Sequence, residues 1–428
     1  MELVALEDLA ILIYKGMSVK ARNYHNLDHV FSLIDEEAPI LTLTALFHDL
    51  VYWQVDRGFL PEIRLIISPY IVEKDGEIYL QEQAVQSERP FQIALRVFDF
   101  SPGQQLTLAI GLNEFLSALV MVKKLEKFLD ERDLLRLLLC VEASIPFRES
   151  AVTGADHFYA LEARASKIDQ DWRLEMGPSQ VQAAVKQAVI FANRDVDSFA
   201  ETDVSCYLET TWKLMPETNS YLRSIDTYSI REYRQALQAM SASMSRLKAE
   251  RVFHQYRGLP PDPEYQRLVA QARQNIEAGR QYLQIKLLTQ AILEALAEAT
   301  GGDAPLSLFM GDLPQKGVRP RRLEDYLPKF DLPAWVDTTS PVFYLLSDQH
   351  SLDSNFDLHT APLTLFVYAS LTPEETTELL VVAVQMFDGK VDAREFLAAV
   401  KPGVLSPIAG ACAKMAFTRQ EQLKHYAV

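Results

Sequence analysis

Apolar residues recur at helical spacing along most of the chain, and this pattern predicts a mainly α-helical protein. One predicted helix ends at Gly301-Gly302, because glycine readily adopts the left-handed backbone that stops a helix. Another begins at Thr372-Pro373-Glu374-Glu375, which has the composition of a capping box with proline in the first helical position. The segments expected to be helical include Glu7 to Lys15, Asn26 to Ile34, Leu41 to Gln54, Gln105 to Leu129, Asp130 to Glu142, Gln180 to Ala200 and Glu264 to Thr300.

The region from Glu62 to Phe100 departs from this helical pattern. Ile63 to Val72 is rich in β-branched residues, and Asp75-Gly76 is a typical hairpin turn. Ile78 to Leu80 would be the returning strand, and Phe91 to Phe100 would add a third. The sequence therefore predicts an all-α fold with a small β insert at about residues 60–100.

The chain is long enough, at 428 residues, for one large helical domain or two smaller ones. The best candidate for a boundary is the stretch around Ser220 to Ser229, and Pro260 to Pro263 marks a second break. We predict a first domain at 1–225 and a helical C-terminal region at 226–428.

Composition restricts the classes of partner and the cellular setting. With 42 basic and 58 acidic residues, the net charge of −16 argues against general nucleic-acid binding, which depends on Lys and Arg. Three widely spaced cysteines, Cys140, Cys206 and Cys412, form neither a disulfide framework nor a cysteine zinc site, so we expect a reducing cytoplasm. Residues 1–4 carry an acid where a signal peptide needs a positive charge, and the apolar run 379–387 is too short to span a bilayer.

Three of the eight histidines, His25, His29 and His48, lie close together in the N-terminal part of the chain. Residues four apart share one face of a helix, so His25 and His29 can point the same way. His48 and Asp49 would lie about 100° apart on the predicted helix, a spread that still reaches one ion from one side. Their neighbours are apolar, and a buried aspartate is costly unless it is paired or bound to a metal.

A fourth metal ligand is expected from the predicted helix 180–200. Its small and apolar residues form one stripe, and Asp195 lies on that stripe. Asp197, the rival carboxylate, lies about 200° away on the side of Lys186 and Asn193. Two histidines and two carboxylates suit Zn²⁺, Mn²⁺ or Fe²⁺, and the sequence does not choose among them.

The arrangement resembles the HD-domain superfamily of metal-dependent phosphohydrolases, in which a histidine, a His-Asp pair and a distant aspartate bind the ion. The resemblance places these ligands at His29, His48-Asp49 and Asp195. The segment from His25 to His29 is also similar to the H-N-x-x-H motif of class I cyclic-nucleotide phosphodiesterases. In those enzymes the first histidine is the general acid and the second is a ligand, which implies an acid role for His25.

A second resemblance is to the bacterial predicted metal-dependent HD phosphohydrolases, which share three motifs in the same order. R-x-Y-H corresponds to residues 22–25, H-D-x-V-Y to residues 48–52, and N-E-x-x-S-A to residues 113–118. The likeness covers roughly residues 20 to 200 and is interrupted by the β insert.

Two departures limit what the resemblance implies. Tyr52 stands where the phosphodiesterases carry a third histidine, and Glu142 to Arg148 replaces their later Thr-Asp-Met-x-x-His segment. Both departures argue against cyclic-nucleotide activity and against a second metal, although Mg²⁺ at a second site is left open. The missing histidines also argue against the di-iron oxygenase branch of the superfamily.

Further residues have expected roles around the metal. Asp49 would both bind the ion and orient a water, and Arg22 and Arg148 are the nearest basic candidates for the phosphate charge. Glu114 has Gly111, Ser117 and Ala118 on its face of the helix, so it is a candidate for an inward-pointing carboxylate near the metal or at a second metal. Tyr52 is interpreted as a core residue beside the site.

The expected function is metal-dependent hydrolysis of a small, nucleotide-like phosphodiester or phosphomonoester. The alternative is a non-catalytic HD scaffold that binds a nucleotide or a protein and signals through residues 226–428. Outside the motifs, Asp388 to Glu395 resembles half of a calcium loop, but Val384 and Met386 stand where oxygen ligands are needed. We therefore interpret Asp392 with Glu395 as a helix cap.

Overall fold

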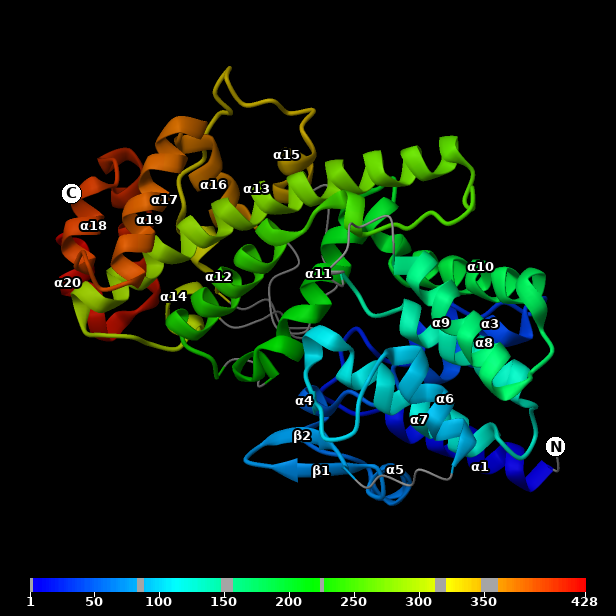
Figure 1. Cartoon of the computed structure of the whole chain (residues 1–428). Helices are drawn as coiled ribbons and strands as arrows, with labels where there is room; N and C mark the ends of the chain where they lie inside the picture. The colour runs from blue at the N-terminus through cyan, green and yellow to red at the C-terminus, as the bar shows by residue number, and fades with distance from the viewer. Residues whose placement is uncertain (1–2, 83–87, 148–156, 224–226, 312–320, 348–360) are drawn as a thin grey trace. The chain divides into compact units, whose positions relative to one another are not determined.

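Helices form most of the secondary structure, as the computed structural model shows for residues 3–82, 88–147, 157–223, 227–311, 321–347 and 361–428 (Figure 1). The expected all-α class with a small β insert is confirmed. The chain divides into two compact units, Met1–Ala200 with Lys248–Ala272, and Glu201–Leu247 with Arg273–Val428. The predicted boundary at 225 differs from this division in two ways. The first continuous part of the first unit ends at Ala200, and the segment Lys248–Ala272, which falls in the predicted C-terminal region, belongs to the first unit.

The first unit is built around α8, in which every residue from Leu134 to Ala143 except Arg136 is buried. Helices α3, α6, α7, α9 and α10 all pack against it. The leucine-rich run of α8 suits such a central position, because apolar side chains on most of its surface are then removed from water. The helices of this unit are α1 (Leu3–Met17), α2 (Leu27–Ser32), α3 (Pro39–Phe47), α4 (Trp53–Asp56), α5 (Pro61–Ile67), α6 (Arg89–Phe98), α7 (Leu112–Leu125), α8 (Glu131–Ala143), α9 (His157–Trp172) and α10 (Gly177–Asp195), with 3-10 turns at Leu108–Ile110, Asp197–Ala200 and Ala249–Arg251.

The β insert is one antiparallel sheet in the order β1 (Ile71–Lys74), β2 (Glu77–Leu80), β3 (Gln105–Leu106). The hairpin predicted at Asp75-Gly76 is confirmed, and both residues adopt positive φ angles, 53° and 80°, as a tight hairpin turn requires.

The strand expected at residues 63–72 is a strand only from Ile71, and the third strand expected at 91–100 is mostly a helix. Residues 63–67 belong to α5, which starts at Pro61, and residues 91–98 belong to α6, which has Pro90 in its first turn. The buried positions Phe91, Ala94, Leu95 and Phe98 follow helical spacing, which favours a helix over the expected third strand. The helix expected from Gln105 starts only at Leu112, because residues 105–106 pair with β2.

The second unit has its own core around the C-terminal part of α13 (Asp262–Thr300). The predicted capping boxes at Thr372 and Asp392 are both confirmed, each with a glutamate three residues later. The other helices of this unit are α11 (Val204–Thr218), α12 (Ile230–Arg246), α14 (Leu306–Met310), α15 (Pro341–Leu346), α16 (Pro362–Ser370), α17 (Pro373–Phe387), α18 (Ala393–Ala399), α19 (Pro402–Met415) and α20 (Gln420–Lys424), with 3-10 turns at Ser220–Arg223, Leu323–Tyr326 and Phe417–Arg419.

Two expectations from composition can be compared with the described residues. Cys140, Cys206 and Cys412 are all free thiols, so the described cysteines form no disulfide. A membrane-crossing helix is also absent from the described part of the chain, since none is both long and apolar enough.

Candidate metal centre

Four side chains that are far apart in the sequence meet in the first unit. His29 comes from α2, His48 and Asp49 follow the end of α3, and Asp195 is the last residue of α10. Asp195 Oδ1 lies 3.2 Å from His29 Nε2 and 3.3 Å from His48 Nε2. Asp49 Oδ2 lies 3.0 Å from His48 Nε2 and 3.5 Å from His29 Nε2. The ligand atoms of His29, His48 and Asp195 all lie within 4.8 Å of one another, so this group could hold a metal ion.

The end of α3 determines how His48 and Asp49 are directed toward His29 and Asp195. The helix predicted over residues 41–54 is interrupted, because α3 ends at Phe47 and α4 begins at Trp53. His48 is the C-terminal cap and Asp49 lies beyond it in a turn, where the Leu50 N–H donates to the Phe47 carbonyl at 3.0 Å. The angular argument from a continuous helix was therefore wrong, although the pair still converges on His29.

The start of α2 positions His29. Asn26 caps the helix, and its side-chain oxygen accepts from the N–H groups of Asp28 at 2.9 Å and His29 at 3.2 Å. The asparagine of the H-N-x-x-H motif therefore has a local structural role. His25 lies just before the cap, with its ring 4.5 Å from Tyr52 and 6.0 Å from His29.

The hydrogen bonding of His48 leaves one ring nitrogen without a partner. His48 Nδ1 lies 2.9 Å from the Ala45 carbonyl oxygen, which only accepts, so Nδ1 carries the hydrogen. The other ring nitrogen, Nε2, is fully buried and faces Asp49 and Asp195. Burial by itself would lower the pKa of His48, but the charges of these two carboxylates raise it well above its ordinary value. At neutral pH this nitrogen therefore carries a proton unless a metal ion takes its place, and either cation balances the carboxylates.

Electrostatics favours positive charge at the same place. Burial by itself would lower the pKa of His29, but its hydrogen bonds and charge interactions with Asp195 and Asp49 raise it to about 9. Burial would raise the pKa of Asp195, but the charge of His48 and the hydrogen bond with His29 lower it to about 2. The pKa of Asp49 is held well below its ordinary value in the same way, with His48 the strongest influence against burial. Two buried carboxylates thus attract either protons or a metal ion.

The donor set and its spacing fit a transition metal. Zinc lies about 2.0–2.2 Å from nitrogen and oxygen ligands, which puts neighbouring ligands of a tetrahedral ion roughly 3.3–3.6 Å apart. The four nitrogen–oxygen separations here run from 3.0 to 3.5 Å, so they overlap this range at its lower end. Asp195, the carboxylate that periodicity favoured, belongs to the group, and Asp197 does not.

Arg22 does not have the role expected of it. Its five N–H groups all donate hydrogen bonds within the protein. Two go to the Asp56 carboxylate, one each to the carbonyls of Asp49 and Leu50, and one to Met17 Sδ. The side chain is fully buried, so no donor is left for a phosphate. Arg148, the other candidate, lies outside the described residues.

Glu114 is half-buried in the first turn of α7. Burial raises its pKa to about 7, and the negative charges of Asp49 and Asp195 act in the same direction. Its neighbours in the N-E-x-x-S motif contact the turn after Asp49, since Ser117 Oγ accepts from Val51 N–H at 2.9 Å and Asn113 Oδ1 from Trp53 N–H at 3.1 Å. Asp56, Asn113 and Ser117 were missed as individual contributors, although the motif itself contained two of them.

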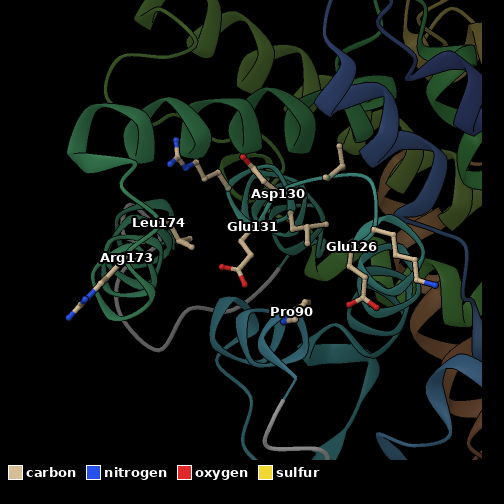
Figure 2. A pocket seen from close by; sticks show the side chains of 10 residues that line it. Pro90, Glu126, Asp130, Glu131, Arg173 and Leu174 are labelled. Atoms are coloured by element: carbon tan, nitrogen blue, oxygen red, sulfur yellow. The ribbon is translucent and has the colours of Figure 1, made fainter. Parts of the chain in front are cut away.

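Two surface pockets of the first unit lie away from this group. One, of about 580 Å³, is lined by residues that include Pro90, Glu126, Asp130, Glu131, Arg173 and Leu174 (Figure 2). Asp130 already caps α8 and Glu131 already pairs with Arg89 at 2.7 Å. The other, of about 530 Å³, is lined by α1, α5 and the end of α7. No residue of the metal group lines either pocket.

Comparisons with models of known protein families, with curated proteins and with solved structures found no significant match for this chain.

Proposed function

We propose that the first unit is a metal-dependent phosphohydrolase of the HD type, in which His29, His48, Asp49 and Asp195 hold one Zn²⁺, Mn²⁺ or Fe²⁺ ion. The observation that carries this proposal is the convergence of His29, His48 and Asp195, in which the buried His48 Nε2 faces two carboxylate oxygens 3.0 and 3.3 Å away. A bound ion of this kind lowers the pKa of a water so that hydroxide forms near neutral pH, and it polarises a phosphoryl oxygen.

The residues in and around the ligand group would orient the water and transfer protons. Asp49 is able to bind with Oδ2, which faces both histidines, and to accept a hydrogen bond from water with its second oxygen. His25 lies near His29 but outside the ligand group, which suits a general acid for the leaving oxygen. Glu114, with a pKa of about 7, is a second group that can exchange a proton near neutral pH.

The proposed substrate is a small, nucleotide-like phosphate ester. The net charge of −16 supports this choice over a nucleic-acid polymer. A cytoplasmic setting is part of the same proposal and is supported by the three free cysteines.

A second candidate function is an HD scaffold that binds a nucleotide or protein without hydrolysing it. The specific observation in its favour concerns Arg22, which was expected to bind the phosphate. All of its N–H groups already donate hydrogen bonds to other groups of the protein. The second unit, which has its own hydrophobic core, would then transmit the signal.

The decisive experiment combines elemental analysis with turnover of bis-p-nitrophenyl phosphate and p-nitrophenyl phosphate. It compares the wild type with His48→Ala, Asp195→Ala and the matched control Asp197→Ala. We expect about one metal per chain, lost together with turnover in the first two variants and retained in the control. Metal without turnover on either ester would favour the scaffold, and a metal-free wild type under every loading condition would reject both the centre and the enzyme.

The acid role of His25 has a separate test. His25→Ala should lower turnover about 10²–10⁴-fold, the usual contribution of a positioned acid, while the metal content stays at the wild-type level. Activated esters need less help from an acid, so the loss should shrink for substrates with better leaving groups. An equal loss for all leaving groups, or a loss of metal, would contradict the assignment.

A further inference from the structure

The turn between α3 and α4 carries buried backbone groups that neither helix satisfies. The carbonyls of Asp49 and Leu50 and the N–H groups of Val51 and Trp53 all bond to side chains from elsewhere in the chain. Leu50 and Val51 are buried, so water does not replace these partners. We call the end of α3 at His48 and Asp49 the His48-Asp49 corner. Its direction therefore depends on side chains that are distant in the sequence.

Arg22 supplies both carbonyl contacts. One terminal nitrogen of its guanidinium donates to the Asp49 carbonyl at 2.7 Å, and the other donates to the Leu50 carbonyl at 3.2 Å. The planar fork fixes the relative direction of two successive carbonyls, which the point charge of a lysine cannot do. The Asp49 carbonyl belongs to the residue whose carboxylate meets His29 and His48.

Asp56 in turn holds the guanidinium. It accepts from Arg22 Nε at 2.9 Å and from Nη2 at 2.6 Å, a bidentate pair in which the arginine side chain is fully buried. Asp56 is the last residue of α4, so the contact also connects the far end of the turn back to Arg22. On the opposite side, Asn113 and Ser117 of α7 bind the two N–H groups of the same turn.

We propose that Arg22 and Asp56 are positioning residues of the metal centre, which together hold the His48-Asp49 corner so that both side chains meet His29 and Asp195. Ser117 and Asn113 complete the support from α7. The inference rests on the metal-binding part of the proposed function and is independent of the hydrolytic part. Side chains that orient metal ligands typically affect metal affinity 10- to 100-fold when they are replaced.

The test measures Co²⁺ affinity and the visible d–d spectrum of the bound ion, which reports ligand geometry, in the full-length protein. The variants are Asp56→Asn, which keeps the size of the side chain, and Arg22→Lys, which keeps the charge. The matched control is Glu162→Gln, because Glu162 forms another bidentate pair, with Arg257, at 3.0 and 3.1 Å in the same unit. Thermal unfolding of each metal-free protein separates loss of fold from loss of geometry.

We expect Asp56→Asn and Arg22→Lys to bind Co²⁺ about 10- to 100-fold more weakly and with an altered spectrum, while Glu162→Gln matches the wild type. Wild-type affinity and spectrum in the folded Asp56→Asn and Arg22→Lys proteins would overturn the proposal, however much stability they had lost. If either variant does not fold, Ser117→Ala decides the question, because it removes a single hydroxyl from the same turn and should still change the spectrum.

The outcomes also separate this inference from the proposed enzyme. A wild type that binds Co²⁺ but hydrolyses no ester would reject the hydrolase and leave the positioning result to stand on affinity and spectrum. A wild type that binds no Co²⁺ would reject both.

Discussion

Two buried charge clusters, one in each unit, differ in whether their charges are satisfied within the protein. In the second unit Glu294 meets Arg234 through two hydrogen bonds of 2.7 and 3.0 Å, and Arg231 adds a third at 3.2 Å. In the first unit two carboxylates share two imidazoles, and His48 Nε2 has no hydrogen bond. The Glu294 cluster is balanced by arginines that stay charged, whereas the His48 cluster is balanced only by protons on both histidines or by a metal ion in their place.

Burial and charge alone therefore do not indicate a functional site. A buried pair whose donors and acceptors are all matched is ordinary structure, even when its residues are costly to bury. A buried polar atom with no partner is rare and calls for an explanation, such as an unseen ion. By this criterion His48 stands out from Glu294, although both are buried to about the same degree.

The largest expected effect comes from breaking the satisfied cluster. Glu294→Gln removes the charge that Arg234 needs, and it should lower the free energy of unfolding by about 3–5 kcal/mol, with or without metal. Urea unfolding measures this loss. The control is Glu298→Gln, because that residue is more exposed and forms an ion pair with Arg231, so its loss should cost much less. Equal losses in the two variants would remove the contrast between the clusters.

Metal addition should act only on the unsatisfied cluster. A metal ion at 100 times its dissociation constant should raise the free energy of unfolding by about 2.7 kcal/mol, because it binds the folded state alone. Thermal unfolding with Zn²⁺ or Mn²⁺ against a chelator measures this shift. Asp195→Asn should abolish the shift and Glu298→Gln should keep it. A shift that persists without Asp195 would place the ion elsewhere.

The smallest of the three effects contrasts His29 with another histidine of the first unit. Burial, reinforced by the charge of His157, lowers the pKa of His254 to about 4, whereas the pKa of His29 is raised to about 9. His254 takes up a proton near pH 6.5 in the unfolded chain but only near pH 4 in the folded chain. Acid therefore favours the unfolded chain, and the stability that the neutral imidazole contributes is complete above pH 6.5 and is lost as the pH falls to 4. Between pH 7 and 5 the free energy of unfolding should fall by about 2 kcal/mol for this reason.

Urea unfolding at a series of pH values, with and without His254→Gln, measures that contribution. The ring of His254 lies 5.1 Å from Phe158, a buried core residue, and His254 is not a member of the metal group. The variant should show a shallower loss of stability between pH 7 and 5 than the wild type. Identical pH profiles would mean that His254 is protonated in the folded protein.

Much of the candidate site could be predicted because its signals are periodic and local. The stripe that includes Asp195 on α10 distinguished it from Asp197, and the spacing of His25, His29 and His48 placed them in one region. The fate of Arg22 could not be predicted, since its partners lie up to 34 residues away and depend on how α3 ends. Composition was misleading at α5, where residues of the β-branched segment 63–72 belong to a helix that begins at Pro61.

By itself, the sequence determined the all-α class, the hairpin at Asp75-Gly76, the caps at Thr372 and Asp392, and the set of side chains that meet at His48. The hairpin and the caps depend on residues within one turn, so short-range propensity is enough for them. The ligand residues were identified from their motifs and from one helical stripe, and their meeting at one point is a result of the packing of α2, α3 and α10. The tertiary structure alone decided the return of Lys248–Ala272 to the first unit and the partners of the turn after Asp49. Those partners lie 27 to 66 residues away, and which of them satisfies a buried group depends on packing that no local pattern contains.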